Sequence, residues 1–171
     1  VHITQGSPLW TSARFGEHLL AVNSLTKVYG LSGLRVGWLF TGPELSERAR
    51  AMMDLTSVNN ASPSACLARR ALANIGRLEE RYRGFYSDVQ RVFRRWLAEE
   101  RRVRGYPSHG ALFECIGLPK GVSADYLNEL LVHDYETQVV PGRFFEMPDH
   151  IRVGIALPEA ELAEALSRIR T

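Results

Sequence analysis

The sequence of 171 residues lacks several features that would assign it to a special class of protein. No segment reaches the roughly 18 consecutive apolar residues that a membrane-spanning helix needs. The formal net charge of +2 arises from 21 basic and 19 acidic residues and is too small to indicate a polyanionic partner. We therefore expect a soluble protein with no membrane partner and no nucleic-acid partner, although small anionic ligands remain compatible with this charge.

Cysteine is also scarce. Cys66 and Cys115 lie far apart in the sequence and form no C-x-x-C pair, and two cysteines are too few for a disulfide framework or a zinc site. We expect two buried thiols in a reducing cytoplasm, and no metal site. The chain begins at Val1 rather than Met and shows no signal-peptide pattern, so we expect it to be part of a longer protein.

The first half of the chain predicts two strands followed by two helices. The segments 18–22 and 35–40 are short, apolar and bounded by Gly, Ser and Asn, which favours buried strands. A helix is expected from Pro43 to about Thr56, because proline suits a first turn and the apolar residues recur on one face. Ser62 followed by proline predicts the start of a second helix, which Gly76 would end.

A long helix is expected from Gly76 to about Arg104, where apolar residues recur at spacings of three and four. Arginines and glutamates alternate near its end, which indicates a solvent-exposed face with intrahelical ion pairs rather than a nucleic-acid surface. We place a domain boundary near Arg77. Residues 1–77 would form one body and residues 78–171 a second, joined by this helix.

The remainder of the second body predicts a small α+β unit. Helices are expected at about Ala124–His133 and Pro158–Ile169, among three strand-like runs. These runs are ALFECIGL (111–118), TQVVPG (137–142) and HIRVGIA (150–156).

The stretch SLTKVYGLSGLRVG, residues 24–37, concentrates groups suited to an anionic ligand. The Ser24 hydroxyl can donate to a phosphate, and Arg35 can offer a planar fork of donors to the same anion. The intervening glycines permit tight turns and close backbone approach. A lysine beside such a pocket is desolvated and close to another cation, and both effects favour the neutral amine that attacks carbonyl carbons. The pattern predicts Schiff-base chemistry at Lys27.

This stretch closely resembles the pyridoxal-phosphate attachment signature of class I/II aminotransferases. The resemblance implies that Lys27 is the catalytic residue and binds the aldehyde of pyridoxal 5'-phosphate, while Ser24 and Arg35 bind the phosphate. It also implies an α/β fold of type I. The chain would supply the C-terminal part of the large cofactor domain, a three-layer α/β/α structure, together with the small α+β C-terminal domain.

A second segment supports the resemblance. Residues 139–156, VVPGRFFEMPDHIRVGIA, look like the C-terminal segment of the same family, in which a proline-glycine turn precedes a strand that carries an arginine. That arginine is Arg152. In the family it binds the substrate α-carboxylate through a bidentate pair, which fixes the orientation of the amino acid.

The resemblance implies a pyridoxal-phosphate-dependent aminotransferase of amino-acid metabolism, acting on an α-amino acid and a 2-oxo acid. Family members are much longer, and residues 1–26 contain no Asp to pair with the pyridine nitrogen. We therefore expect the C-terminal half of an enzyme, with little activity alone. The full enzyme would be a cytoplasmic homodimer. The segment 58–65 either approaches the neighbouring subunit's cofactor or is only a loop and helix start.

Other functions remain compatible with these motifs. A lyase or decarboxylase of the same fold would keep Lys27 and Arg152, because the same cofactor can direct cleavage of different bonds. A transcription regulator could retain an aminotransferase-like domain as a ligand sensor. A domain that binds nothing is the third alternative.

Overall fold

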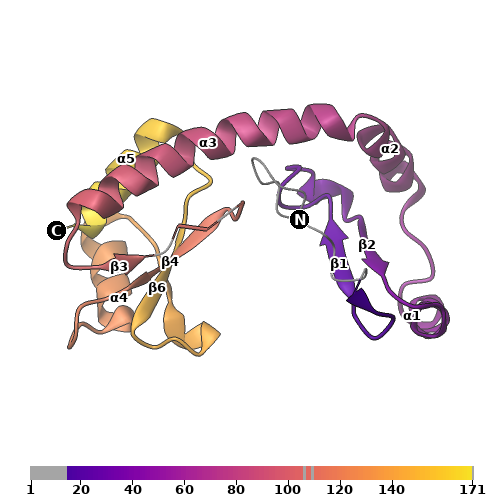
Figure 1. Cartoon of the computed structure of the whole chain (residues 1–171), viewed down its shortest axis with the longest axis horizontal. Coiled ribbons are helices and arrows are strands. Elements are labelled where there is room, and N and C mark those ends of the chain that lie inside the picture. The colour runs from indigo at the N-terminus through magenta and orange to yellow at the C-terminus, as the bar shows by residue number, and fades with distance from the viewer. Residues whose placement is uncertain (1–14, 106, 109, 171) are drawn as a thin grey trace. The chain divides into compact units, whose positions relative to one another are not determined.

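The computed structural model describes residues 15–105, 107–108 and 110–170 (Figure 1). The chain divides into two compact units, Val1–Arg83 and Gly84–Thr171. The division falls inside the long helix α3 (Ile75–Glu99), a few residues after the predicted boundary near Arg77.

The first unit contains an antiparallel pair of short strands. Strand β1 (Ala21–Ser24) pairs with β2 (Gly37–Phe40), and Ser24 lies opposite Gly37. The first strand begins later than the predicted segment 18–22. The expectation of buried strands is wrong: the side chains of Val22 and Phe40 are 76% and 55% exposed. The described residues of this unit supply no layer that covers these apolar side chains.

Two helices follow the strands in the predicted places. Helix α1 (Pro43–Thr56) and helix α2 (Ser62–Ala73) each carry a proline in the first turn, where its missing N–H needs no partner. The described part of α1 has no buried residue, and α2 buries only Ala68. Much of the apolar surface of this unit is therefore exposed. Its exposed large apolar side chains on α1 and α2 are Leu45, Met52, Met53, Leu55, Leu67 and Leu72.

The second unit is built on a four-stranded antiparallel sheet. Its spatial order is β3 (Arg104–Gly105), β4 (Phe113–Gly117), β6 (His150–Gly154) and β5 (Val140–Pro141). The three predicted strand-like runs thus form β4, β5 and β6. Helix α3 ends earlier than predicted, because the chain turns after it and Arg104 pairs with Gly117 of β4.

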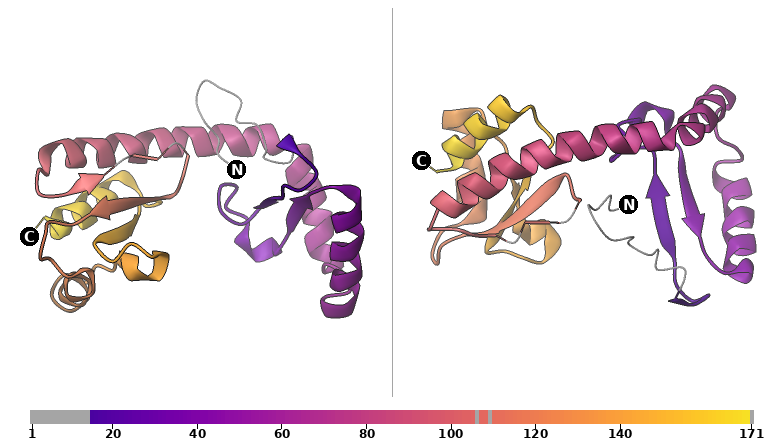
Figure 2. Two further views of the ribbon diagram at one scale, coloured as in Figure 1. Left: turned by 60° about the horizontal axis from the view of Figure 1, so that its bottom comes forward. Right: turned by 45° about the horizontal axis from the view of Figure 1, so that its top comes forward.

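Three helices pack with this sheet around one core. Helix α5 (Glu159–Ile169) lies alongside α3 (Figure 2), and ion pairs join Arg91 to Glu159 at 3.0 Å and Glu99 to Arg170 at 3.3 Å. Helix α4 (Ala124–Tyr135) begins after Ser123, whose hydroxyl accepts a hydrogen bond from the Tyr126 amide. The fully buried large side chains of the core are Val89, Phe93, Ile116, Leu131, Ile151, Ile155, Leu162 and Leu166.

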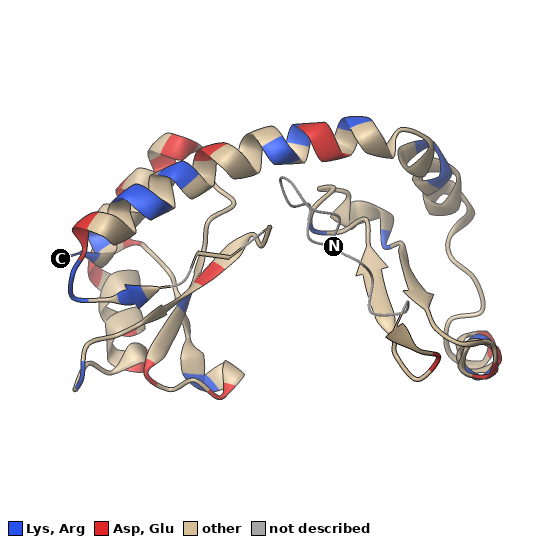
Figure 3. Cartoon of the chain, viewed as in Figure 1, with Lys and Arg blue, Asp and Glu red and all other residues tan. Residues whose placement is uncertain are grey.

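Both signs of charge occur along α3 (Figure 3). Intrahelical ion pairs join Glu79 to Arg83 and Asp88 to Arg91. The predicted exposed face with intrahelical ion pairs is thus found earlier in α3 than expected, whereas near its end Glu99 pairs with Arg170 and Glu100 is buried.

The cysteines differ from expectation. Cys66 is exposed on α2 and Cys115 is partly buried, so the prediction of two buried thiols is wrong. Cys66 is exposed because no described residue packs against that side of α2. Within the described ranges, no helix is long and apolar enough to cross a lipid bilayer.

Candidate functional site

Three of the predicted site residues lie at the connection between β1 and β2: Ser24 ends β1, and Lys27 and Arg35 lie in the loop that follows. The Leu25 amide donates to the Val36 carbonyl at 3.0 Å and so extends the pairing beyond Ser24 and Gly37. The loop therefore leaves and re-enters the two-stranded sheet at one end. This topology brings Ser24 and Arg35, on opposite arms of the loop, to the same end of the sheet.

Gly37 permits this close approach. A Cβ atom at this position would lie 2.8 Å from the carbonyl oxygen of Asn23 and 3.3 Å from the Cβ of Ser24. The backbone beside Ser24 therefore requires glycine, which gives one of the glycines in the stretch a physical role.

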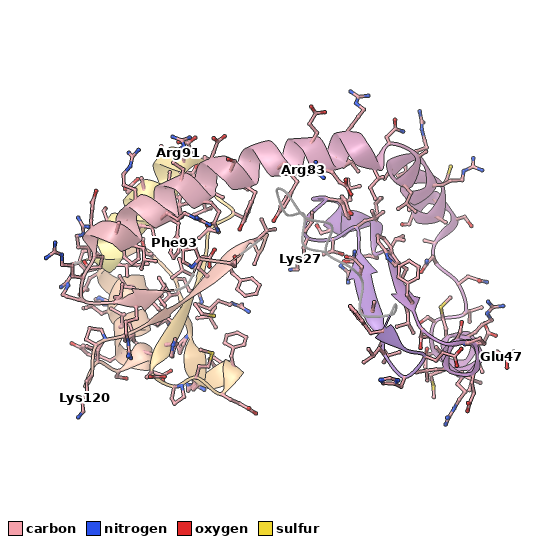
Figure 4. All side chains as sticks on the ribbon, viewed as in Figure 1. Lys27, Glu47, Arg83, Arg91, Phe93 and Lys120 are labelled. Atoms are coloured by element: carbon pink, nitrogen blue, oxygen red, sulfur yellow. The ribbon has the colours of Figure 1, made fainter. Side chains whose placement is uncertain are left out.

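A tight turn presents Lys27. The Gly30 amide donates to the Lys27 carbonyl at 3.1 Å, and Gly30 has the left-handed φ of +69° that glycine adopts without strain. Leu25 anchors this part of the loop, since its side chain is fully buried. The Lys27 side chain is exposed on the loop after β1 (Figure 4), so the expected desolvation of this lysine is not found in the described part of the chain.

Helix α3 forms a hydrogen bond with the same loop. A guanidinium nitrogen of Arg81 donates to the Tyr29 carbonyl at 3.2 Å. The Tyr29 side chain is buried, and burial, together with the negative charge of Glu79, raises the pKa of its phenol. Tyr29, the residue before Gly30, is thus held by the hydrogen bond from α3 and by the burial of its own side chain.

Ser24 and Arg35 each keep hydrogen-bond donors that are available to a ligand. The Ser24 hydroxyl oxygen accepts from the Thr26 amide at 3.3 Å, and its own hydrogen remains to donate. One Arg35 guanidinium nitrogen donates to the Ser32 carbonyl at 3.4 Å. Arg35 also has a left-handed φ of 53°, a strained conformation for a residue other than glycine.

The loop contains no acidic residue. The sequence has no Asp or Glu between Glu17 and Glu44, and within the described residues neither Lys27 nor Arg35 forms an ion pair. Two cations without a neutralising carboxylate, together with a hydroxyl donor at the same sheet end, form a donor set suited to a phosphate.

Arg152 lies in the second unit, in the middle of β6. Its strand neighbours Ile151 and Val153 are buried in the core, so Arg152 lies on the opposite face of the sheet. There it pairs across the ladder with Cys115 of β4 and Val140 of β5. The side chain is partly buried, and no acidic residue in the described part of the chain forms an ion pair with it.

The proline-glycine turn before β6 depends on close backbone contacts. A Cβ atom at Gly142 would lie 2.0 Å from the Met147 carbonyl oxygen and 2.6 Å from that of His150. The Met147 amide donates to the Gly142 carbonyl at 3.0 Å. Glycine thus allows the compact turn that contains the 3-10 helix η3 (Gly142–Phe145).

Comparison with known proteins shows the family of this chain. The family model described as aminotransferase class I and II matches residues 5–169. The chain belongs to this aminotransferase family. Class I and II aminotransferases use pyridoxal phosphate, as the resemblance of the Lys27 stretch implies.

Relatives in this aminotransferase family differ in their named activities. An aspartate aminotransferase of Streptomyces avermitilis is 28% identical, over 90% of this chain and 40% of its own length. An arginine–pyruvate transaminase of Pseudomonas aeruginosa is 30% identical, over 90% of this chain and 40% of its own. A capreomycidine synthase of Streptomyces vinaceus is 26% identical, over 95% and 42%. The chain therefore spans about two fifths of the length of these relatives.

Solved aminotransferase structures share the fold. The aspartate aminotransferase of Rhizobium meliloti is 26% identical, with a TM-score of 0.82 over 99% of this chain and 46% of its own. A mutant aspartate aminotransferase of Thermus thermophilus has a TM-score of 0.87 at 21% identity, over 99% of this chain and 47% of its own. The predicted α/β fold, as part of a pyridoxal-phosphate-dependent aminotransferase, is confirmed.

Sequence reasoning missed two kinds of residue around the site. It gave no role to Arg81, whose contact with the Lys27 loop spans 52 positions and leaves no local pattern. It also overlooked Phe113 and Phe145, whose rings lie near the Arg152 guanidinium. The alternation in β4 could have placed Phe113 on the open face, because Ile116 at the other parity is buried.

Proposed function

We propose that this chain carries the cofactor lysine and the carboxylate-binding arginine of a pyridoxal-phosphate-dependent aminotransferase. The enzyme would transfer an amino group between an α-amino acid and a 2-oxo acid. The observation that carries this proposal is the loop geometry: Ser24 and Arg35 lie at the same end of the sheet, and Lys27 lies in the turn between them, with no acidic partner among the described residues.

The residues present fit the cofactor. Pyridoxal phosphate, when bound, supplies an aldehyde that captures amines and a ring that withdraws electrons from the attached carbon. Lys27 would hold the aldehyde end. Ser24 would donate one hydrogen bond to the phosphate, and Arg35 would donate a charge-assisted fork to it.

Lys27 has a second role in the proposal. As a free amine, Lys27 would act as a general base, and its Nζ atom would accept the proton from the substrate α-carbon. The same Nζ atom would carry this proton until it is donated again to complete the transfer. Arg152 would bind the substrate α-carboxylate with two parallel hydrogen bonds and so orient the α-carbon.

The rest of the enzyme would have to supply further groups. This chain covers only about 40% of the length of a relative such as the Streptomyces avermitilis aspartate aminotransferase. The first unit also exposes apolar side chains such as Val22 and Phe40. These observations support an active enzyme that includes additional chain packed on the first unit. We place it in the cytoplasm, where the free thiols of Cys66 and Cys115 stay reduced.

We also propose that the full enzyme is a homodimer that uses the segment 58–65. This segment is mostly exposed, and Val58 combines 62% exposure with a left-handed φ of 58°. An exposed apolar residue held in a strained conformation supports a contact with a second subunit. The domain division proposed at residues 1–77 and 78–171 places this segment in the cofactor-binding part.

A second candidate is a lyase or decarboxylase of the same fold. The observation that favours it is the similarity to capreomycidine synthase, a relative whose name does not describe an aminotransferase. Both candidates use Lys27 in the same way and differ in which bond at the substrate α-carbon is broken.

The test is a half-reaction with the full enzyme that contains this chain, loaded with pyridoxal phosphate. A transaminase consumes one amino acid, releases one 2-oxo acid and keeps the amine until a second 2-oxo acid removes it. Lys27→Ala should abolish this exchange, whereas Lys120→Ala should leave it intact because Lys120 is exposed in the other unit. Release of carbon dioxide or of an elimination product, without retained amine, would favour the lyase.

A further inference from the structure

The surroundings of Arg152 contain two aromatic rings. The central carbon of its guanidinium lies 4.4 Å from the ring centroid of Phe145 and 5.3 Å from that of Phe113. Both distances fall within the roughly 6 Å limit for a cation over an aromatic face. We refer to Phe113 and Phe145 as the aromatic pair.

The two rings come from separate elements of the second unit. Phe113 is the first residue of β4 and pairs with Gly154, so it is a diagonal neighbour of Arg152 on the same open face of the sheet. Phe145 ends η3 and depends on the compact turn at Gly142. Their convergence on one guanidinium therefore requires both the strand register and the turn.

A neighbouring arginine shows a different arrangement. Arg143 lies over the ring of Phe144 at 4.0 Å, and its Nε also donates to Asp125 at 2.8 Å. Arg152 is less exposed than Arg143, and no acidic side chain in the described ranges forms an ion pair with it. Arg143 thus has both a ring and a carboxylate as partners, whereas the partners of Arg152 in the described ranges are the two rings of the aromatic pair.

This difference matters for ligand binding. A ring face attracts the positive charge of a guanidinium but does not use its N–H donors, which lie in the guanidinium plane. A protein carboxylate at Arg152 would occupy the same donors that a substrate carboxylate needs. Aromatic faces stabilise the partly buried cation without that competition.

We propose that Phe113 and Phe145 are positioning residues that stabilise the unpaired guanidinium of Arg152 and keep its donors available to a substrate carboxylate. This inference rests on the proposed function, in which Arg152 binds that carboxylate. It assigns to the aromatic pair a contribution to substrate affinity that is separate from the chemical step.

The main experiment measures steady-state kinetics of the full enzyme with an amino acid and with the amine that lacks its carboxylate. Phe145→Leu should raise KM for the amino acid by about 2- to 10-fold, with kcat little changed, because a cation–ring contact contributes to binding. The same variant should leave the amine reaction unchanged. Phe145→Tyr, which keeps the ring face, should restore the KM.

The chain offers a matched control. Phe144 is adjacent and more exposed than Phe145, and its ring contacts Arg143 rather than Arg152. Phe144→Leu should therefore leave KM for the amino acid unchanged. Equal effects of Phe144→Leu and Phe145→Leu would overturn the inference, since both would then reflect a general disturbance of the turn.

The experiment separates failure of the inference from failure of the proposed function. If Arg152→Lys leaves KM for the amino acid unchanged, the carboxylate role itself is wrong and the inference falls with it. If Arg152→Lys raises KM but Phe145→Leu and Phe113→Leu do not, only the inference is overturned.

A second measurement requires no catalysis. Nuclear magnetic resonance of the full enzyme should show ring-current shifts of the Arg152 side-chain protons, identified by their loss in Arg152→Lys. Phe145→Leu should move these resonances, and Phe144→Leu should not. Unchanged resonances in Phe145→Leu would show that the ring does not cover the guanidinium, which would overturn the inference.

Discussion

Replacing Glu100 with glutamine removes a buried charge next to the end of α3. The side chain of Glu100 is only 6% exposed. Its carboxylate accepts hydrogen bonds from the Arg102 side chain at 2.8 and 2.9 Å and from the Arg102 amide at 3.0 Å. Arg170, just after α5, forms a further ion pair with it at 3.4 Å. The carboxylate therefore links the C-terminal ends of two helices.

These contacts lower the pKa of Glu100 from 4.5 to about 2, chiefly through the hydrogen bonds from Arg102, against the opposing effect of burial. Such a difference corresponds to at most about 3 kcal/mol of stability. The side chains of Arg102 and Arg170 are 59% and 43% exposed, so solvent screens part of the interaction. We expect a contribution of about 1–3 kcal/mol at neutral pH.

The direction of the pH dependence follows from the lowered pKa. The stabilisation is fully present above pH 4.5, where the carboxyl is ionised in both the folded and the unfolded chain. It is lost as the pH falls from 4.5 towards 2, because the unfolded chain then binds the proton more readily. Glu100→Gln should thus be less stable than the native chain at pH 7, and the difference should shrink by pH 3.

The assay is urea unfolding of both chains at a series of pH values between 7 and 3. Glu99→Gln is the matched control, because Glu99 is 58% exposed and has a single ion pair to Arg170. We expect this control to differ from the native chain by less than about 1 kcal/mol. A Glu100→Gln difference that stays constant from pH 7 to pH 3 would refute the reasoning, since the ionised carboxylate would not be its source.

Three further substitutions test the backbone geometry through the free energy of unfolding. Gly142→Ala should destabilise the chain by about 1–3 kcal/mol or more, because its Cβ would lie 2.0 Å from the Met147 carbonyl oxygen. Gly154→Ala should change stability by less than about 0.5 kcal/mol, because a Cβ atom at this position would meet nothing within 4 Å. Equal effects of Gly142→Ala and Gly154→Ala would contradict this account of the turn. Val58→Gly should stabilise the chain by about 0.5–1 kcal/mol, because it relieves a left-handed φ of 58° in a β-branched residue. A loss of stability there would show that the conformation of Val58 is not strained.

Local patterns in the sequence predicted much of the fold. The bounds of α1 match the predicted segment, because Pro43 starts the helix and the apolar residues repeat with helical spacing. The strand pattern located β4 and β6, where alternate residues such as Ile151 and Val153 are buried. Each of these signals depends on a few neighbouring residues.

Burial and long-range contacts were harder to predict. Val22 belongs to an apolar run that favours a buried strand, yet its exposure depends on which other segments pack against β1. Arg104 looked like the end of a helix but pairs with Gly117, and strand pairing over such a separation has no local pattern. The ring of Phe145 over Arg152 likewise depends on how the turn at Gly142 folds back.

For the candidate site as well, local features were predictable from the sequence and long-range contacts were not. The stretch from Ser24 to Gly37 was recognised from residue types and spacing, and the pairing of Ser24 with Gly37 puts Ser24 and Arg35 at the same end of the sheet. The contact from Arg81 to the Tyr29 carbonyl was not predictable, since it joins two elements remote in the sequence.

Chemical trapping of the cofactor tests the central claim most directly. This chain contributes two lysines, Lys27 and Lys120, and digestion separates them into different peptides. The full enzyme would be mixed with pyridoxal phosphate, reduced with borohydride, digested and analysed by mass spectrometry. We predict a pyridoxyl group on Lys27, strongly reduced in Arg35→Ala and absent from Lys120. Equal labelling of the two lysines, or none at Lys27, would contradict the account.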